Sequence, residues 1–139
     1  MWGDGSGYLL AVGENGIMLQ YDNDEWAPIT SPVTNSLRAI WGASRDELFA
    51  VGDDGIVRYH GGEWTVTPAP GGVWLGALWG CGADDVIAVG GAGTILEFDG
   101  DVWKTTPPLT TLDLIGVWGA SRDNVWVVGW KSIVLRYSK

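Results

Sequence analysis

One dipeptide, Trp-Gly, recurs along the whole chain and constrains the fold more than any other feature of the sequence. It begins at four positions, in steps of 39, 38 and 39 residues: Trp2, Trp41, Trp79 and Trp118. A Val-Gly pair follows each of these residues ten positions later, at Val12, Val51, Val89 and Val128. In the first three units an aromatic residue is followed five positions later by a second Trp: Trp26, Trp64 and Trp103. Self-similarity at a fixed period of this length is the signature of a repeat protein.

Each repeat unit is predicted to form four short β-strands. In the second unit these strands span roughly 37–42, 47–52, 55–60 and 63–68, which are rich in β-branched, aromatic and small residues. Gly, Asp, Asn and Pro fill the breaks, and the run Asp53-Asp54-Gly55 marks a tight hairpin. The run 125–128 is apolar without alternation, which is typical of a strand that is covered on both faces.

These features predict an all-β fold, a β-propeller built from four four-stranded blades of about 39 residues each, with truncated ends. A flat β-solenoid is the alternative, although its coils are normally shorter. We assign residues 1–139 to a single module, a whole propeller or a half-propeller, with units at about 1–36, 37–73, 74–113 and 114–139. The first unit lacks most of its first strand, and the fourth unit lacks its last strand.

The two end blades are predicted to need a covering partner. Open blades would expose apolar faces and unpaired strand edges, which favour aggregation. Closed symmetry is the usual way in which proteins cover such surfaces. We therefore expect self-assembly, most simply a homodimer in which two chains close one ring of about eight blades. A strained four-bladed ring made by one chain and a piece cut from a longer propeller are the alternatives.

The charge balance excludes some partners. Eight Lys and Arg residues stand against seventeen Asp and Glu residues, which gives a formal net charge of −9 and a pI near 4.2. Nucleic acids and anionic membranes attract basic surfaces, so we expect neither as a partner. The first residues have neither the basic start nor the apolar core of a signal peptide, and the localisation stays open. One His and one Cys leave little for catalysis or for metal binding.

The unit can be written Trp-Gly-x-x-x-x-Asp-x-x-x-Val-Gly-x-x-Gly-x-Ile-Leu-x-Tyr-x-Gly-x-x-Trp. It resembles the tryptophan-rich propeller repeats of myxobacteria and related bacteria, which are common in large secreted and lipoprotein-like proteins. Its second half, as in Phe98-Asp99-Gly100-Asp101-Val102-Trp103, also resembles a degenerate Asp-box hairpin of sialidase-like propellers. The resemblance implies a propeller fold and no particular activity, because the Asp-box is a structural turn and the arginine cluster of sialidases is not recognisable here.

Six residues are candidate contacts for a ligand or a partner. Trp130, which lies beside Lys131, replaces the small turn residues of the other units, so a Trp is expected on an exposed hairpin tip. Trp74 lies in a connection between two units. Three Asp residues recur between the first and second strands: Asp46, Asp84 and Asp123. They either face a ligand or, as we favour, hold the turn through an Asx-type hydrogen bond. The other Trp residues lie at or near repeat positions and are expected to fill the space between blades.

The sequence predicts no catalytic residue, no cofactor and no metal site. We expect a non-catalytic binding or scaffold module that uses its loop faces and central opening. Its expected partners are a second copy of itself and a protein or glycan ligand. A lectin-like propeller is the first alternative, and it would repeat a shallow aromatic site in each blade. A fragment of a larger propeller enzyme, a lyase or a glycosidase, is the second, and it would have one acidic cleft.

Overall fold

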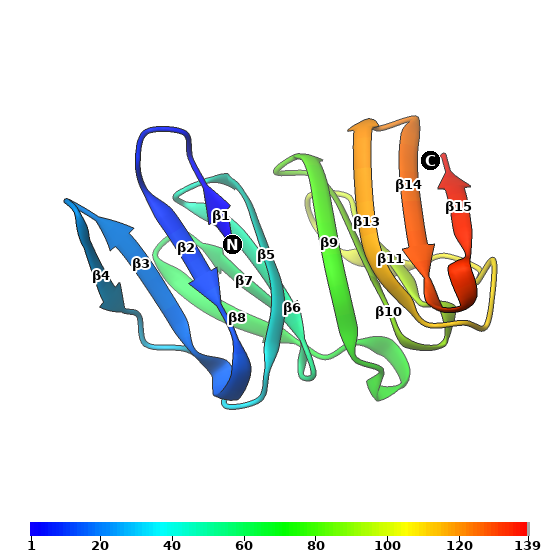
Figure 1. Ribbon diagram of the computed structural model, residues 1–139, viewed down its shortest axis with the longest axis horizontal. Helices are drawn as coiled ribbons and strands as arrows, with labels where there is room; N and C mark the ends of the chain where they lie inside the picture. The colour runs from blue at the N-terminus through cyan, green and yellow to red at the C-terminus, as the bar shows by residue number, and fades with distance from the viewer. Residues whose placement is uncertain (139) are drawn as a thin grey trace.

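The computed structural model describes residues 1–138 and consists of four antiparallel β-sheets, each in chain order (Figure 1). Blade one contains β1 (Trp2–Gly3), β2 (Leu9–Val12), β3 (Met18–Asp22) and β4 (Glu25–Pro28). Blade two contains β5 (Leu37–Ser44), β6 (Glu47–Gly52), β7 (Gly55–His60) and β8 (Glu63–Thr67). Blade three contains β9 (Leu75–Gly82), β10 (Asp85–Gly90), β11 (Ile95–Phe98) and β12 (Trp103–Thr105). Blade four contains β13 (Leu114–Ser121), β14 (Asn124–Gly129) and β15 (Val134–Tyr137).

The remaining regular structure is a set of single 3-10 turns: η1 (Glu14–Gly16), η2 (Pro70–Gly72), η3 (Gly91–Gly93) and η4 (Trp130–Ser132). No α-helix occurs between residues 1 and 138. Within that range, accordingly, no helix is long and apolar enough to span a bilayer.

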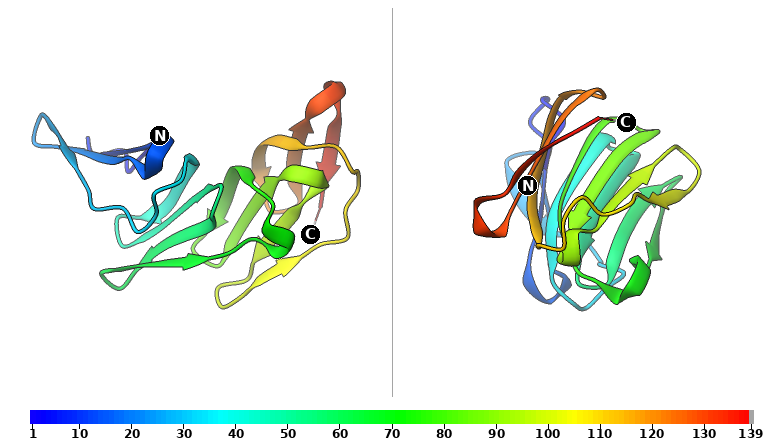
Figure 2. Two further views of the ribbon diagram at one scale, coloured as in Figure 1. Left: turned by 90° about the horizontal axis from the view of Figure 1, so that it is seen from below. Right: turned by 90° about the vertical axis from the view of Figure 1, so that its right-hand side faces the viewer.

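The four sheets stand side by side as blades in an open arc (Figures 1 and 2). The first strand of each blade lies on the inside of the arc, where β9 contacts both β5 and β13. Blades one and four lie at opposite ends, so this chain does not close on itself as a four-bladed ring. The predicted propeller blades are confirmed, and so are the short ends: β1 has two residues and the last sheet has three strands.

An apolar core lies between each pair of neighbouring blades. Between blades two and three, the Phe49 ring packs against Phe98 and Trp103, at centroid distances of 5.2 and 5.9 Å. Between blades three and four, Ile87 packs with Val125. Because each middle blade has a core on both sides, β6 and β10 are buried along their whole length. This double burial is the reason for the unbroken apolar runs in the sequence.

The repeated Trp-Gly pair joins one blade to the next. The contact recurs at three successive pairs: Trp2 on Gly42, Trp41 on Gly80, and Trp79 on Gly119. A β-carbon built on Gly80 would lie 2.5 Å from the Trp41 ring, so the ring occupies the space that a side chain would need. Each of these Trp side chains therefore packs on the glycine of the following blade. Within one Trp-Gly pair of a middle blade, the Trp contacts the next blade and the glycine contacts the previous one.

The glycine of the Val-Gly pair lies against the connection between blades. A β-carbon on Gly90 would overlap the carbonyl oxygen of Trp74, and one on Gly52 would overlap that of Ser36. The N–H of Gly91 donates to the same Trp74 carbonyl at 3.0 Å, which ties the turn to the connection. Gly13, the counterpart in blade one, differs because nothing lies within 4 Å of its β-carbon position.

The prediction that the periodic Trp residues fill the space between blades is only partly right. Trp26, Trp118 and Trp126 are 47%, 62% and 42% exposed, and the other periodic Trp residues are half-buried. The fully buried aromatic residues are instead Phe49 and Phe98. The large indole side chain is rarely enclosed completely, and apart from Trp126 on β14 these Trp residues lie on the first or the last strand of a blade, at an edge of its sheet.

Candidate partner-binding surface

The loops gather on two opposite faces of the arc. The linker face holds the turns between second and third strands and the interblade connections, and the hairpin face holds the other turns. The residues singled out from the sequence divide between these faces. The linker face carries Trp74, Trp130 and Lys131, and the hairpin face carries Asp46, Asp84 and Asp123.

A groove of about 450 Å³ on the linker face brings the two aromatic candidates together. It is lined by six residues: Arg38, Trp74, Gly76, Asp113, Ile115 and Trp130. They come from the starts of the inner strands, from the connections before blades three and four, and, for Trp130, from the η4 turn of blade four. Residues 92 positions apart in the chain therefore share one surface. We call this surface the Trp74–Trp130 groove.

Trp74 is fixed in the groove by backbone on one side and a cation on the other. β-Carbons at Gly76 and Gly91 would lie 2.7 and 3.0 Å from its indole, so the ring rests directly on the main chain. The Arg38 guanidinium carbon lies 5.2 Å from the ring centroid, in cation–π range. Asp53 accepts hydrogen bonds from Arg38 Nε and Nη2 at 3.0 and 2.8 Å, which orients the guanidinium.

Trp130 projects from η4, the turn between β14 and β15, and is 61% exposed, as the sequence predicts. Its N–H donates to the carbonyl of Asp113 at 2.9 Å, while the Asp113 carboxylate accepts from the N–H of Ala92 at 2.8 Å. Asp113 thus ties the turns of blades three and four together beneath the indole. Lys131 is exposed on the same turn and does not line the groove.

The three candidate Asp residues lie exposed on the hairpin face, each on a different blade. Asp46 donates its N–H to Ser44 Oγ at 3.2 Å, so Ser44 rather than Asp46 holds that turn. Arg45 and Arg122, which directly precede Asp46 and Asp123 in the chain, form their ion pairs with other residues. Arg45 pairs with Asp4 in blade one, and Arg122 lies 3.6 Å from Asp85 in blade three, so both arginines bridge two blades.

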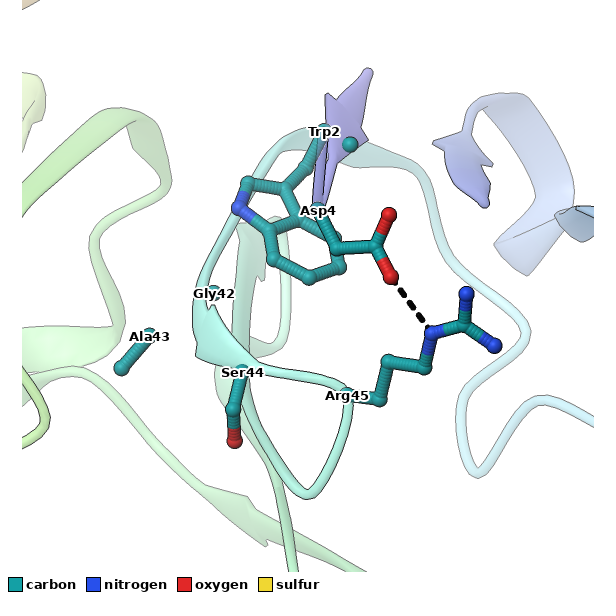
Figure 3. A pocket seen from close by; sticks show the side chains of 7 residues that line it. Trp2, Asp4, Gly42, Ala43, Ser44 and Arg45 are labelled. Atoms are coloured by element: carbon teal, nitrogen blue, oxygen red, sulfur yellow. Dashed lines mark hydrogen bonds and ion pairs between the residues drawn. The ribbon is translucent and has the colours of Figure 1, made fainter. Parts of the chain in front are cut away.

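A second hollow opens on the hairpin face beside Trp2 and Arg45 (Figure 3). The Asp4 carboxylate accepts from Arg45 Nε at 2.5 Å and from the N–H of Ser6 at 2.8 Å. The Arg45 guanidinium carbon also lies 4.2 Å from the Tyr8 ring centroid. The polar groups of this hollow satisfy one another, which favours a role in joining blades one and two. Sequence reasoning missed this pair because Asp4 and Arg45 are 41 residues apart.

The Asp4 carboxyl should make stability depend on pH. The N–H of Ser6, with further help from Arg45, lowers the pKa of Asp4 well below its usual range. A carboxyl with a lowered pKa in the folded state stabilises the protein above its unfolded pKa of about 3.9, and this contribution is lost as the pH falls through the folded value. We expect Asp4→Asn to be destabilised near neutral pH and to approach the wild type in acid. Urea unfolding between pH 2 and 7 tests this, and a constant difference over that range would contradict it.

The residues that the structure describes gather no metal-binding set. Residues 1–138 contain no group of three or more His, Cys, Asp or Glu side chains that could hold a metal ion. The single His, His60, contacts the carboxylate of Glu47, which also accepts from Arg58 Nε at 2.6 Å. The Arg58 guanidinium carbon lies 4.8 Å from the Phe98 ring centroid in blade three, so this cluster joins blades two and three.

No family model matches the chain, and no curated protein matches it by sequence. Two solved structures are similar in fold. A structure of YCF48 bound to a D1 peptide matches with a TM-score of 0.80 and 19% identity, over 99% of this chain and 50% of that one. YCF48 from Cyanidioschyzon merolae matches with a TM-score of 0.73 and 13% identity, over 94% of this chain and 50% of that one. This chain therefore spans about half the length of the YCF48 chains, and what it shares with them is the β-propeller fold.

Proposed function

We propose that this chain is a non-catalytic β-propeller module that binds a segment of a partner protein in the Trp74–Trp130 groove and that also assembles with a second copy of itself. The observation that carries the binding proposal is the exposed Trp130 indole beside the Arg38–Trp74 pair on one loop face. Loops held by a rigid scaffold are the usual place for binding residues. Exposed Trp and Arg side chains are also the types that dominate binding energy at protein interfaces.

The chemistry of the groove suits an extended peptide. Two indoles and Ile115 offer apolar contact, while Arg38 and Asp113 offer charges of both signs. A peptide presents both apolar and polar groups, and the groove lining has side chains that can contact each kind. The peptide bound in one of the YCF48 structures supports the same kind of ligand for this fold.

A glycan is the second candidate, because exposed Trp rings also stack on sugars. A lectin-like propeller would repeat its aromatic site in each blade. The other units have Glu14, Asp53 and Gly91 where blade four has Trp130. A single aromatic site favours one asymmetric ligand, so we give preference to a protein segment.

Selection from a random peptide library displayed on phage, followed by calorimetry with the selected peptides, tests the proposal. Trp130→Ala and Arg38→Ala are each expected to weaken binding at least tenfold, which corresponds to about 1.4 kcal/mol. Trp26→Ala is the matched control, because Trp26 is exposed on blade one and lies outside the groove. Selected peptides that bind all three variants equally would overturn the proposal. Binding on a glycan array that depends on Trp130, without any selected peptide, would favour the lectin alternative.

A further inference from the structure

Blade four presents a free apolar sheet face at one end of the arc. Three exposed side chains lie on its second and third strands: Trp126 (42%), Val128 (42%) and Val134 (59%). A fourth, Trp118 (62%), lies on its inner strand β13. The repeat positions of Trp126, Val128 and Val134 are fully buried in the middle blades. They hold Phe49, Val51 and Ile56 in blade two and Ile87, Val89 and Ile95 in blade three, none of which is more than 1% exposed. The equivalent faces of blades two and three are each covered by the next blade, whereas this face of blade four is uncovered.

Blade one presents the complementary face at the other end of the arc. Its uncovered positions are half-buried: Leu9, Ala11, Leu19 and Tyr21. They match Val86, Ala88, Leu96 and Phe98 of blade three, which receive the face of blade two and are at most 1% exposed. Blade four thus leaves uncovered the face that elsewhere packs on the next blade, and blade one leaves uncovered the face that elsewhere packs on the previous blade.

The Trp-Gly contacts identify the same two ends. Three Trp residues pack on the glycine of the next blade, whereas within residues 1–138 no blade follows blade four for Trp118 to pack on. Gly3 is the glycine of the first Trp-Gly pair, and it is exposed, with no Trp ring near its β-carbon position. One end of the arc therefore has a Trp-Gly tryptophan, Trp118, without its usual glycine contact, and the other end has a Trp-Gly glycine, Gly3, without its usual Trp contact.

The charges of the end units are also complementary. Residues 1–36 contain five acidic residues and no basic ones, whereas residues 114–139 contain four basic residues and one acidic one. Opposite charges of this kind favour contact between unlike ends and disfavour contact between like ends. One pairing can be named, because Arg136 and Tyr21 occupy the repeat positions of Arg58 and Phe98, which are in cation–π contact across the blade two–three interface.

We infer that two copies of this chain close head to tail, with blade four of each docked on blade one of the other, Trp118 seated on Gly3 and Arg136 stacked on Tyr21. This inference rests on the self-assembly part of the proposed function and names its interface. A head-to-tail contact leaves free faces unless it closes into a ring. This chain superposes on half the length of a YCF48 chain, so its blades are arranged as in part of a longer β-propeller.

Light scattering over a dilution series gives the first test. The wild-type chain is expected at twice its 14.9 kDa mass, and a strictly monomeric wild type would overturn the inference. Trp118→Ser and, on the same face, Val134→Lys are expected to be monomeric at concentrations where the wild type is dimeric. Trp130→Ser is the matched control, because Trp130 is 61% exposed against 62% for Trp118 but lies on the linker face. A dimer that survives Trp118→Ser and Val134→Lys would also refute the interface.

A mixing experiment separates head-to-tail contact from contact between like faces. Ala11→Arg places a charge on the free face of blade one and is expected to be monomeric alone. Mixed with Trp118→Ser, it restores one intact pair of faces, so an open dimer is expected to return in the mixture. If Ala11→Arg leaves the dimer intact, the contact joins two blade-four faces and the inference is wrong. Peptide binding in the groove is measured separately, so a monomer that binds selected peptides would refute the interface and leave the binding proposal standing.

Discussion

Gly90→Ala is expected to cost at least about 3 kcal/mol of unfolding free energy, at the upper end of what overpacking a core costs, or to prevent folding. The added β-carbon would overlap the carbonyl oxygen of Trp74, which is main chain and cannot rotate away. Gly90 is fully buried, and the Trp74 carbonyl also accepts the N–H of Gly91, so the connection cannot shift without breaking that bond. Urea unfolding followed by tryptophan fluorescence measures the loss.

Gly13→Ala is the matched control for Gly90→Ala. Gly13 follows Val12 as Gly90 follows Val89, and both glycines have an extended φ, −164° and −169°. Nothing lies within 4 Å of the β-carbon position of Gly13, so this substitution is expected to change the unfolding free energy by less than about 1 kcal/mol. Equal losses at the two positions would show that backbone conformation, and not the close approach of the connection, accounts for the conserved spacing of Val-Gly within the chain.

Phe49→Ala is expected to destabilise the protein by about 3–5 kcal/mol, which is typical of removing a buried Phe side chain. Phe49 is 0% exposed and packs against Phe98 and Trp103 of the next blade. The space that it leaves is bounded by two sheets whose inner strands are in contact, so it cannot collapse easily. The Arg58 guanidinium, which stacks on both Phe49 and Phe98, would lose one of its two rings as well.

The control for Phe49→Ala is Trp130→Ala, which removes a larger but exposed ring. We expect it to change the unfolding free energy by less than about 0.5 kcal/mol, as exposed substitutions usually do. Both variants can be compared by urea unfolding at one protein concentration. A loss below about 1 kcal/mol for Phe49→Ala would mean that the blade two–three core is not closely packed.

The repeat in the sequence was sufficient to predict the blades. The fixed spacing of Trp-Gly and Val-Gly follows from contacts that recur at each blade junction, such as Trp41 on Gly80 and the Trp74 carbonyl on Gly90. Strand order and turn positions follow from local chemistry, since Gly55 sits in the predicted hairpin with φ of 103°. The likeness to the tryptophan-rich bacterial propeller repeats stays a prediction, because the similar structures share only the fold.

The degree of burial at a repeat position could not be predicted from the repeat. Phe49 and Trp126 occupy the same position in blades two and four, and one is 0% exposed while the other is 42% exposed. The difference arises because blade three covers Phe49, whereas no described blade follows blade four. Periodicity gives a residue its face of the sheet, and only the neighbouring blade decides whether that face is covered.

The sequence by itself determined the fold class, the four blades and the aromatic candidates Trp74 and Trp130, because these depend on contacts within about one repeat length. Only the tertiary structure decided that Trp74 and Trp130 share a groove with Arg38, and that Arg45 pairs with Asp4 across two blades. Those groupings depend on how the blades stack around the inside of the arc. Blade stacking brings together side chains that are far apart along the chain, and no local pattern in the sequence records which ones will meet.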